Sequence, residues 1–190
     1  MSKCKRNSLV YLENERGGAH VVLLALLAAV FLITVFIVGI NYGLSVTSQT
    51  KYKSYLDVAS KAAASRPNFD PEELAYGRLV WDSAKGTTDF YRYLRLNFKL
   101  DNGNAPLANS PLPAPPIVHS IEFLTSPTYP TVVNRTVTVY GGTADETTRN
   151  VQATIYGPSI VAIVEFRQDQ IGTTRNEPII IPSVASVRFR

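Results

Sequence analysis

Residues 19–40 read AHVVLLALLAAVFLITVFIVGI and contain no Asp, Glu, Lys or Arg. At about 1.5 Å per residue, a helix of this length spans about 33 Å, which matches a hydrocarbon core of about 30 Å. A helix in a soluble protein buries one stripe and is not apolar on every face over such a length. The pattern therefore predicts a single transmembrane helix over residues 19–40, surrounded by membrane lipid.

The flanks of this segment predict how it is retained and oriented. The apolar core of a secretory signal is shorter, at about 7–15 residues, and the following NYGLSVTSQT offers no convincing small-residue cleavage site. An uncleaved anchor is thus favoured over a signal peptide. Basic residues gather on the cytoplasmic side of a membrane helix. Here they precede it, at Lys3, Lys5, Arg6 and Arg16, so residues 1–18 are predicted to be a cytoplasmic leader and the remainder extracytoplasmic.

The helix is expected to continue beyond the membrane, because no helix-breaking signal occurs before Arg66-Pro67. One helix over about residues 18–65 would then include an amphipathic stalk over residues 41–65. Its apolar side chains recur at helical spacing and need partners, since an isolated helix gains little stability from propensity alone. They can pack on the protein's own β-rich region or on another subunit. The Ala-rich end of the stalk favours a neighbouring helix, and we predict an assembly surface at Tyr52, Tyr55, Leu56 and Ala59.

Residues 66–116 predict short helices and a connector. Asp70-Pro71 is a good helix start, with Leu74, Val80 and Trp81 as its buried face and Gly86 as its end. Thr88-Asp89 is expected to cap a second helix that reaches Phe98. A rival interpretation exists, because residues 94–100 alternate strictly as a strand would, but the helix is preferred. Residues 101–116, DNGNAPLANSPLPAPP, form a proline-rich connector.

From residue 117 the pattern changes to strands. Five segments are rich in Val, Ile, Thr, Tyr and Phe and are separated by turn residues: 117–124, 132–140, 151–156, 160–166 and 179–189. We expect a small antiparallel β-sheet domain with one face packed on helices. The fold class is therefore α+β, with a long N-terminal transmembrane and stalk helix in front of a β-rich extracytoplasmic region at residues 117–190.

Charge and cysteine content exclude several classes of partner and site. The formal net charge of +4 divides into +2 from residues 1–18 (four basic minus two acidic) and +2 from residues 41–190 (fifteen minus thirteen). Neither part has the basic stripe of a nucleic-acid-binding protein. The one cysteine, Cys4, precedes the apolar run, so no intrachain disulfide or thiolate metal site is expected beyond it.

No catalytic constellation is evident in the sequence. There is no nucleophile elbow, no paired His spacing for a metal, no calcium loop and no glycine-rich phosphate loop. His20 lies at the membrane entry, and His119 is interpreted as a surface or strand residue. We therefore expect a protein that is not an enzyme, that needs no cofactor or metal, and for which no small-molecule substrate is evident.

The N-terminal arrangement resembles the TadE/TadG-like proteins of tight-adherence (Flp-type) pilus systems. It consists of a charged leader ending in Glu15-Arg16-Gly17-Gly18, an apolar helix, and a stalk ending in SKAAAS at residues 60–65. The resemblance implies a pilin-like structural or assembly component of a pilus or secretion-type envelope machine, which contacts other subunits through the stalk. A membrane-anchored extracytoplasmic binding or sensor domain is the alternative.

The resemblance also marks a candidate processing junction at Gly17 and Gly18. Pilin-like proteins usually carry a glutamate in the first turns of the apolar helix, five residues beyond the junction. Counting from either glycine reaches Val22 or Leu23 here. The missing glutamate departs from the family pattern, so we expect the leader to be retained and the protein to stay resident in the membrane.

Overall fold

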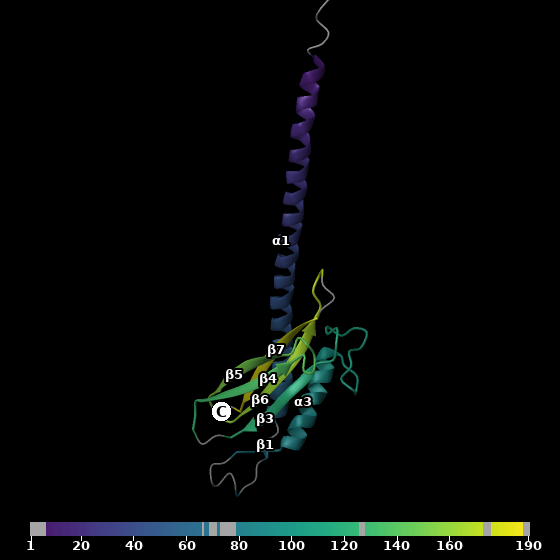
Figure 1. The fold of residues 1–190 in the computed structure, drawn as a ribbon. Helices are drawn as coiled ribbons and strands as arrows, with labels where there is room; N and C mark the ends of the chain where they lie inside the picture. The colour runs from purple at the N-terminus through teal and green to yellow at the C-terminus, as the bar shows by residue number, and fades with distance from the viewer. Residues whose placement is uncertain are drawn as a thin grey trace, which may run out of the picture. The chain divides into compact units, whose positions relative to one another are not determined.

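The computed structural model describes the backbone of residues 7–65, 67–68, 72, 79–125, 128–172 and 176–187. It describes side chains over the same ranges from residue 18 onward, except at 67–68. The chain divides into two compact units, Met1–Leu44 and Ser45–Arg190, which are described separately. The order of elements combines a long helix, a shorter one and antiparallel strands, so the α+β prediction is confirmed (Figure 1).

The first unit consists of the N-terminal part of α1, a helix over Asn7–Ala64. The predicted helix over residues 18–65 is confirmed, and it begins eleven residues earlier than expected. The side chains between Gly18 and Phe36 are all exposed. One stretch of α1 has a mean hydropathy of 3.3 and no burial, which makes this helix long and apolar enough to cross a membrane.

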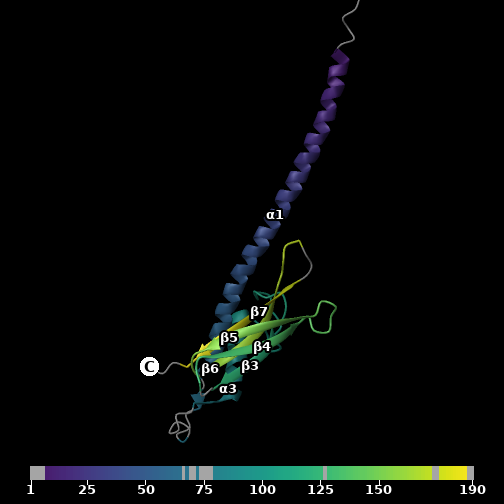
Figure 2. The same cartoon turned by 60° about the vertical axis from the view of Figure 1, so that its left-hand side comes forward.

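The second unit contains the strands. Their bounds are β1 Pro67–Asn68, β2 Val80–Trp81, β3 Ile117–Leu124, β4 Thr131–Val139, β5 Thr147–Ile155, β6 Ser159–Gln168 and β7 Glu177–Ser186. All five predicted strands are present, within a few residues at their ends. They do not form one sheet as expected. Instead, β3-β6-β7 make a three-stranded sheet and β4-β5 make a separate ribbon (Figure 2). The short strands β1 and β2 pair on their own.

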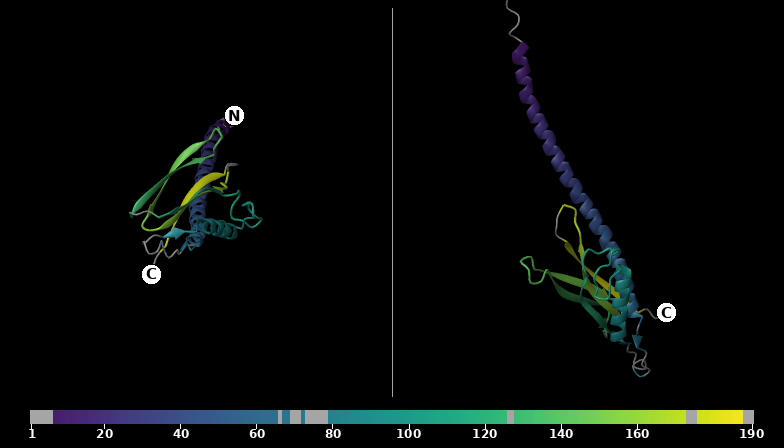
Figure 3. Two further views of the ribbon diagram at one scale, coloured as in Figure 1. Left: turned by 90° about the horizontal axis from the view of Figure 1, so that it is seen from below. Right: turned by 90° about the vertical axis from the view of Figure 1, so that its right-hand side faces the viewer.

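The central strand β6 explains this arrangement. Its sequence SIVAIVEFRQ is a continuous apolar run with nine of ten residues buried, the pattern of a strand covered on both faces. Ile160, Ala162, Val164 and Phe166 face the core formed with α1 and with α3, a shorter helix over Ser83–Phe98. Val161 and Ile163 face the other way, into a second core with the β4-β5 ribbon. The domain is therefore a three-layer stack of helices, sheet and ribbon (Figure 3).

The helix α3 spans Ser83–Phe98, so the preferred helix is right and the rival strand is wrong. Its start was misplaced, because Asp82 rather than Thr88-Asp89 is the N-cap, with its side chain accepting a bond from the backbone N–H of Lys85. The predicted stop at Gly86 is also wrong. This residue lies buried inside α3, where a Cβ would come within 2.7 Å of the Phe123 ring. Gly86 therefore permits a close approach between helix and sheet.

The predicted helix after Asp70 needs a correction at its far end. Val80 and Trp81 form the short strand β2 and pair with Asn68 and Pro67. Trp81 packs against Phe123 of the sheet, with ring centroids 6.0 Å apart. Leu74 lies outside the described residues. The proline-rich connector has no named strand or helix, and Leu112 from it is buried in the helix-side core.

Candidate functional site

The exposed apolar surface of the first unit is the first candidate for a functional surface. Twelve large apolar side chains between Val21 and Phe36 are more than half exposed, which is far beyond what soluble monomers tolerate as a contiguous patch. Gly17 and Gly18, the candidate processing junction, both lie within the backbone of α1. Gly18 is exposed and has open space around it. Cleavage at this junction stays a prediction.

The predicted assembly surface on the stalk is corrected by the structure. Leu56 and Ala59 are 0% exposed and Tyr52 is 4% exposed, all inside the helix-side core of their own domain. Tyr55 packs at the edge of the same core. The expectation failed because helical spacing reports that a face is buried, and it does not report what covers that face. Here α3 and the β3-β6-β7 sheet cover it, so Tyr52, Leu56 and Ala59 are not available to another subunit, whereas Tyr55 is partly exposed.

Tyr52 is the centre of an aromatic cluster within this core. Its ring lies 5.2 Å from Phe166 and 5.7 Å from Phe98, between centroids. Its hydroxyl donates a hydrogen bond of 3.0 Å to the carbonyl of Pro111. Burial raises the pKa of Tyr52 above its usual value of 10.0, and the negative charge of Asp169 adds to the rise, against an opposing hydrogen bond with Ser48. The cluster thus joins α1, α3, the sheet and the connector.

A charged cluster lies on the opposite face of the sheet. Glu165 of β6 is 1% exposed, and its two carboxylate oxygens lie 3.0 Å from His119 Nε2 and 2.7 Å from an Arg167 nitrogen. The guanidinium of Arg167 also stacks over the ring of Tyr140 at 4.3 Å. The Tyr140 hydroxyl in turn donates to the carbonyl of Asn176. A buried carboxylate requires such partners, because an unpaired buried charge is strongly destabilising.

His119 reaches Glu165 because the β3-β6 register shifts between Val118 and Ser120. A bulge of this kind re-aims one side chain of a strand. The neighbouring Ser120 hydroxyl is buried and makes no hydrogen bond, so His119 does not activate it as a base would activate a nucleophile. The prediction of His119 as a strand residue is confirmed. Its bond to Glu165 could not be read from the sequence, because the two residues are 46 positions apart.

The ribbon is fastened to the sheet by a second ion pair. Arg135 of β4 points inward with Val133 and Val137 and donates from Nε to Glu122 of β3 at 2.6 Å. A second guanidinium nitrogen bonds the other carboxylate oxygen, which makes the pair bidentate. The hydrogen bond and the charge of Glu122 raise the pKa of Arg135. This pair is partly exposed and links β4 of the ribbon to β3 of the sheet.

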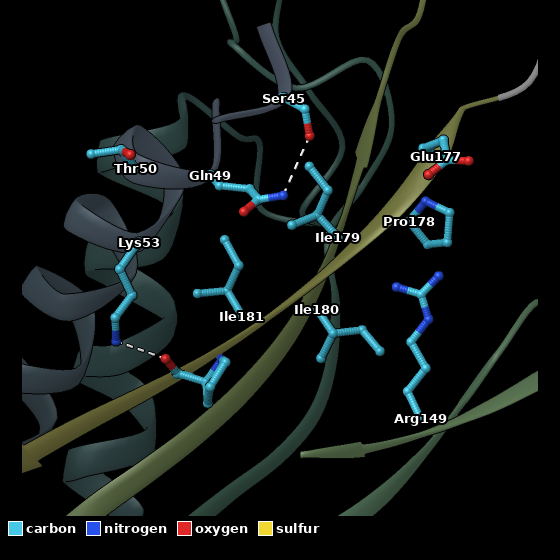
Figure 4. Close-up of a pocket in the computed structure, with 11 residues that line it drawn as sticks. Ser45, Gln49, Thr50, Lys53, Arg149, Glu177, Pro178, Ile179, Ile180 and Ile181 are labelled. Carbon is cyan, nitrogen blue, oxygen red and sulfur yellow. Dashed lines mark hydrogen bonds between the residues drawn. The ribbon is translucent and has the colours of Figure 1, made fainter. Parts of the chain in front are cut away.

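A cavity of about 510 Å³ lies between α1, β5 and β7 (Figure 4). Its floor is Pro178 and the isoleucines of β7, and its rim is polar, with Ser45, Gln49, Thr50, Lys53, Arg149 and Glu177. A volume of this size suits a small ligand. Lys53 is already engaged, because it bonds Asp57 at 2.8 Å and the carbonyl of Pro182 at 2.7 Å.

The bond from Lys53 also defines the free edge of β7. Since Pro182 directs its carbonyl toward Lys53 and away from β6, alternate residues of β7 direct their backbone groups to the outer edge. Two of these outward positions are Pro178 and Pro182, which have no N–H to offer a further strand. Prolines on an edge strand are a common protection against unwanted pairing, and so is a helix that covers the edge. The cavity is therefore a poor site for strand addition.

In the part of the chain that the structure describes, no group of three or more His, Cys, Asp or Glu residues could hold a metal ion. Comparisons with protein-family models, with curated proteins and with solved structures find no match to this chain.

Proposed function

We propose that this protein is a membrane-anchored, pilin-like structural or assembly component of a surface pilus or secretion-type envelope machine. The observation that supports the proposal is that the two ends of one helix have different surroundings. Between Val21 and Phe36, α1 exposes a run of large apolar side chains, whereas its last part supplies Tyr52, Leu56 and Ala59 to the core of a folded domain. A free-standing anchor needs no such continuity, because a linker joins a membrane helix to a domain equally well.

In this proposal the N-terminus is cytoplasmic and the domain of Ser45–Arg190 is extracytoplasmic. The basic leader supports this orientation. The absence of cysteine after Cys4 means that the domain's stability does not depend on oxidation. Its two apolar cores and the Glu165 cluster support the fold instead.

The test is an exchange of the apolar segment. In the native cell, deletion of the gene should remove a surface appendage or block secretion, and the wild-type gene should restore it. A variant in which residues 19–40 are replaced by an unrelated apolar helix of equal length should insert in the membrane yet fail to restore the phenotype, since subunit contacts depend on side-chain packing between helices. Full restoration by the unrelated helix would show that the segment is only an anchor, and would contradict the proposal.

The cavity between α1, β5 and β7 favours the alternative, a membrane-anchored binding or sensor domain. Its apolar floor and polar rim resemble a ligand site in composition. The exchange experiment separates the two functions, because a sensor needs only an anchor. A sensor would instead lose its response when Arg149, an exposed cation on the rim, is changed to Ala.

A further inference from the structure

Shallow grooves also occur outside the β7 cavity. One of about 510 Å³ lies on α3 and combines basic with apolar side chains. Its lining comes from the last turn of α3 and the loop that follows: Arg95, Leu96, Lys99, Leu100, Leu107, Ala108 and Asn109. The loop is held against the helix end, because the backbone N–H of Leu107 donates to the carbonyl of Lys99 at 3.0 Å and Leu100 pairs with Pro106. The groove is thus a built feature of the domain.

The groove carries positive charge without compensation. Arg95 and Lys99 form no ion pair with any carboxylate in the described ranges, and the Nε atom of Arg95 is buried without a hydrogen bond. No acidic residue lines the groove. The nearby Asp101 uses its Oδ1 atom to accept bonds from the backbone N–H groups of Gly103 and Ala105. An anionic group on another molecule would fit here.

The groove is also apolar. Leu96 and Leu107 line it and are 62% and 53% exposed. Cations at the end of a helix are favoured by its dipole, which accounts for Arg95 and Lys99 in part. The dipole does not account for two exposed leucines beside them. Together these residues match an occupant with both a carboxylate and a small apolar side chain.

The turn between β4 and β5 has that composition. Residues 141–148 read GGTADETT, with Ala144, Asp145 and Glu146 exposed and no basic residue among them. The turn is pre-formed, because Thr143 N–H donates to the Tyr140 carbonyl and the Glu146 carboxylate accepts from Gly142 N–H at 2.7 Å. A pre-formed loop loses little conformational entropy on binding.

Groove and turn lie on different sides of the domain. The helix α3 covers one face of the β3-β6-β7 sheet, and the β4-β5 ribbon covers the other. Figure 3 (right) shows the green turn away from the teal α3. A patch and its complement on different sides of one molecule make a head-to-tail contact, which generates rings or open filaments.

We propose that the β4-β5 turn of one copy seats in the α3 groove of the next copy, with Asp145 near Lys99 and Ala144 against Leu107. The occupant is therefore a second copy of this chain. This docking rests on the proposed function as an assembling component, and it names the surface through which the folded domains meet. Exposed ion pairs are weak individually, so the contact depends on copies being concentrated in one membrane.

The experiment uses the full chain in lipid vesicles, with C4S removing the one native cysteine. L107C and A144C are introduced together, and a short bis-maleimide should join copies into dimers and a ladder. K99E should lower the yield at least about threefold, because it replaces an attraction with a repulsion. Adding D145K to the same chain should restore the yield. The matched control is R92E, an exposed cation of the same helix that does not line the groove.

The docking is overturned if K99E and R92E give equal yields, or if D145K fails to restore the K99E variant while circular dichroism shows a native fold. A second variant tests the apolar contact. The crosslinking cysteine is moved from position 107 to position 96 (L96C with A144C), and L107S, which leaves Lys99 and Asp145 unchanged, should lower the yield of crosslinked dimers. Crosslinks between copies through cysteines placed in residues 19–40, without any L107C–A144C product, would leave the proposed function standing and reject this docking. If neither the cysteines in residues 19–40 nor the L107C–A144C pair gives crosslinks between copies, both the proposed function and this docking are rejected.

Discussion

Glu165 has the most deeply buried charge among the ion pairs of the described residues. A carboxylate that is 1% exposed loses its hydration, and among the residues that the structure describes, His119 and Arg167 are the cationic or hydrogen-bonding side chains placed to compensate for the loss. Arg167 is itself held by the Tyr140 ring, so the cluster connects β3, β6 and the end of β4. By contrast, Arg135 and Glu122 are partly solvated, and solvated pairs contribute little to stability. The burial of an ion pair therefore decides how much its loss changes the free energy of unfolding.

The first prediction follows from this difference. R167A should lower the free energy of unfolding by about 3–5 kcal/mol, because it removes the guanidinium partner of a buried carboxylate. Urea unfolding of the full chain in detergent measures the change. R135A is the control and should cost clearly less. Equal losses from the two variants would contradict the importance assigned to burial.

Tyr52 gives a prediction for alkaline pH. Burial raises its pKa in the folded state, whereas an unfolded tyrosine titrates near 10. Above about pH 10 the unfolded state therefore holds fewer protons than the folded state, so stability falls as the pH rises through the folded pKa. Below pH 10 this residue should contribute no pH dependence.

The measurement is thermal unfolding of the wild type and Y52F between pH 8 and pH 11. Y52F removes the ionisable hydroxyl and its bond to Pro111, so it should be less stable at pH 8 and should lose less stability on going to pH 11. Parallel curves for the two proteins would show that the pKa of Tyr52 is the same in the folded and the unfolded state, which contradicts the raised pKa.

At the scale of elements, the spacing of apolar residues predicts the helices and strands well, but it does not predict which segments cover their buried faces. The apolar run, the α3 stripe of Phe90, Leu94 and Phe98, and the five strands all follow from spacing alone. Gly86 was misinterpreted as a stop, since a glycine inside a helix and a glycine at its end look alike in one sequence. The stalk was assigned to an external partner because its cover, α3 and the sheet, comes from residues far along the chain.

Two opposing effects determine how the substitution G86A changes the stability of the domain. Alanine is favoured over glycine within a helix by up to about 1 kcal/mol. The added Cβ, however, would meet the Phe123 ring at 2.7 Å and the Ala63 carbonyl oxygen at 3.3 Å. Overpacking of this kind costs about 1–3 kcal/mol, so G86A should be destabilising. F123L should relieve the clash, and G86A should then be neutral or stabilising in that background, as judged by thermal unfolding. A stabilising G86A in the wild type would show that helix and sheet can move apart freely.

At the scale of the whole molecule, the α+β class and the existence of a long apolar helix could be predicted from sequence. The division of the strands into a sheet and a separate ribbon could not, because β4 and β5 alternate as any half-exposed strands do. Only the unbroken apolar run of β6 carried a signal that both of its faces are covered. The His119–Glu165–Arg167 cluster left no pattern, since it depends on a bulge and on strand pairing.

The topology is open to a direct test. With the N-terminus inside, protease added to spheroplasts should digest the chain beyond about residue 65 and leave the leader protected. An epitope tag at each end, read by immunoblot before and after detergent lysis, distinguishes the two orientations. Mass spectrometry of the same material should find the leader intact. Full-length chain in the soluble fraction, or a protected C-terminal tag, would contradict this arrangement.

The bond between Lys53 and Pro182 joins residues 129 positions apart, and it has a consequence for biosynthesis. A ribosome adds about 5–20 residues per second, so the helix waits roughly 6–26 s for the strand that completes its cover. During that interval Tyr52 and Leu56 have no finished core to enter. Newly made chains should therefore need a chaperone or the membrane surface to shield this segment, and chains that stall before β7 should be substrates for proteolysis.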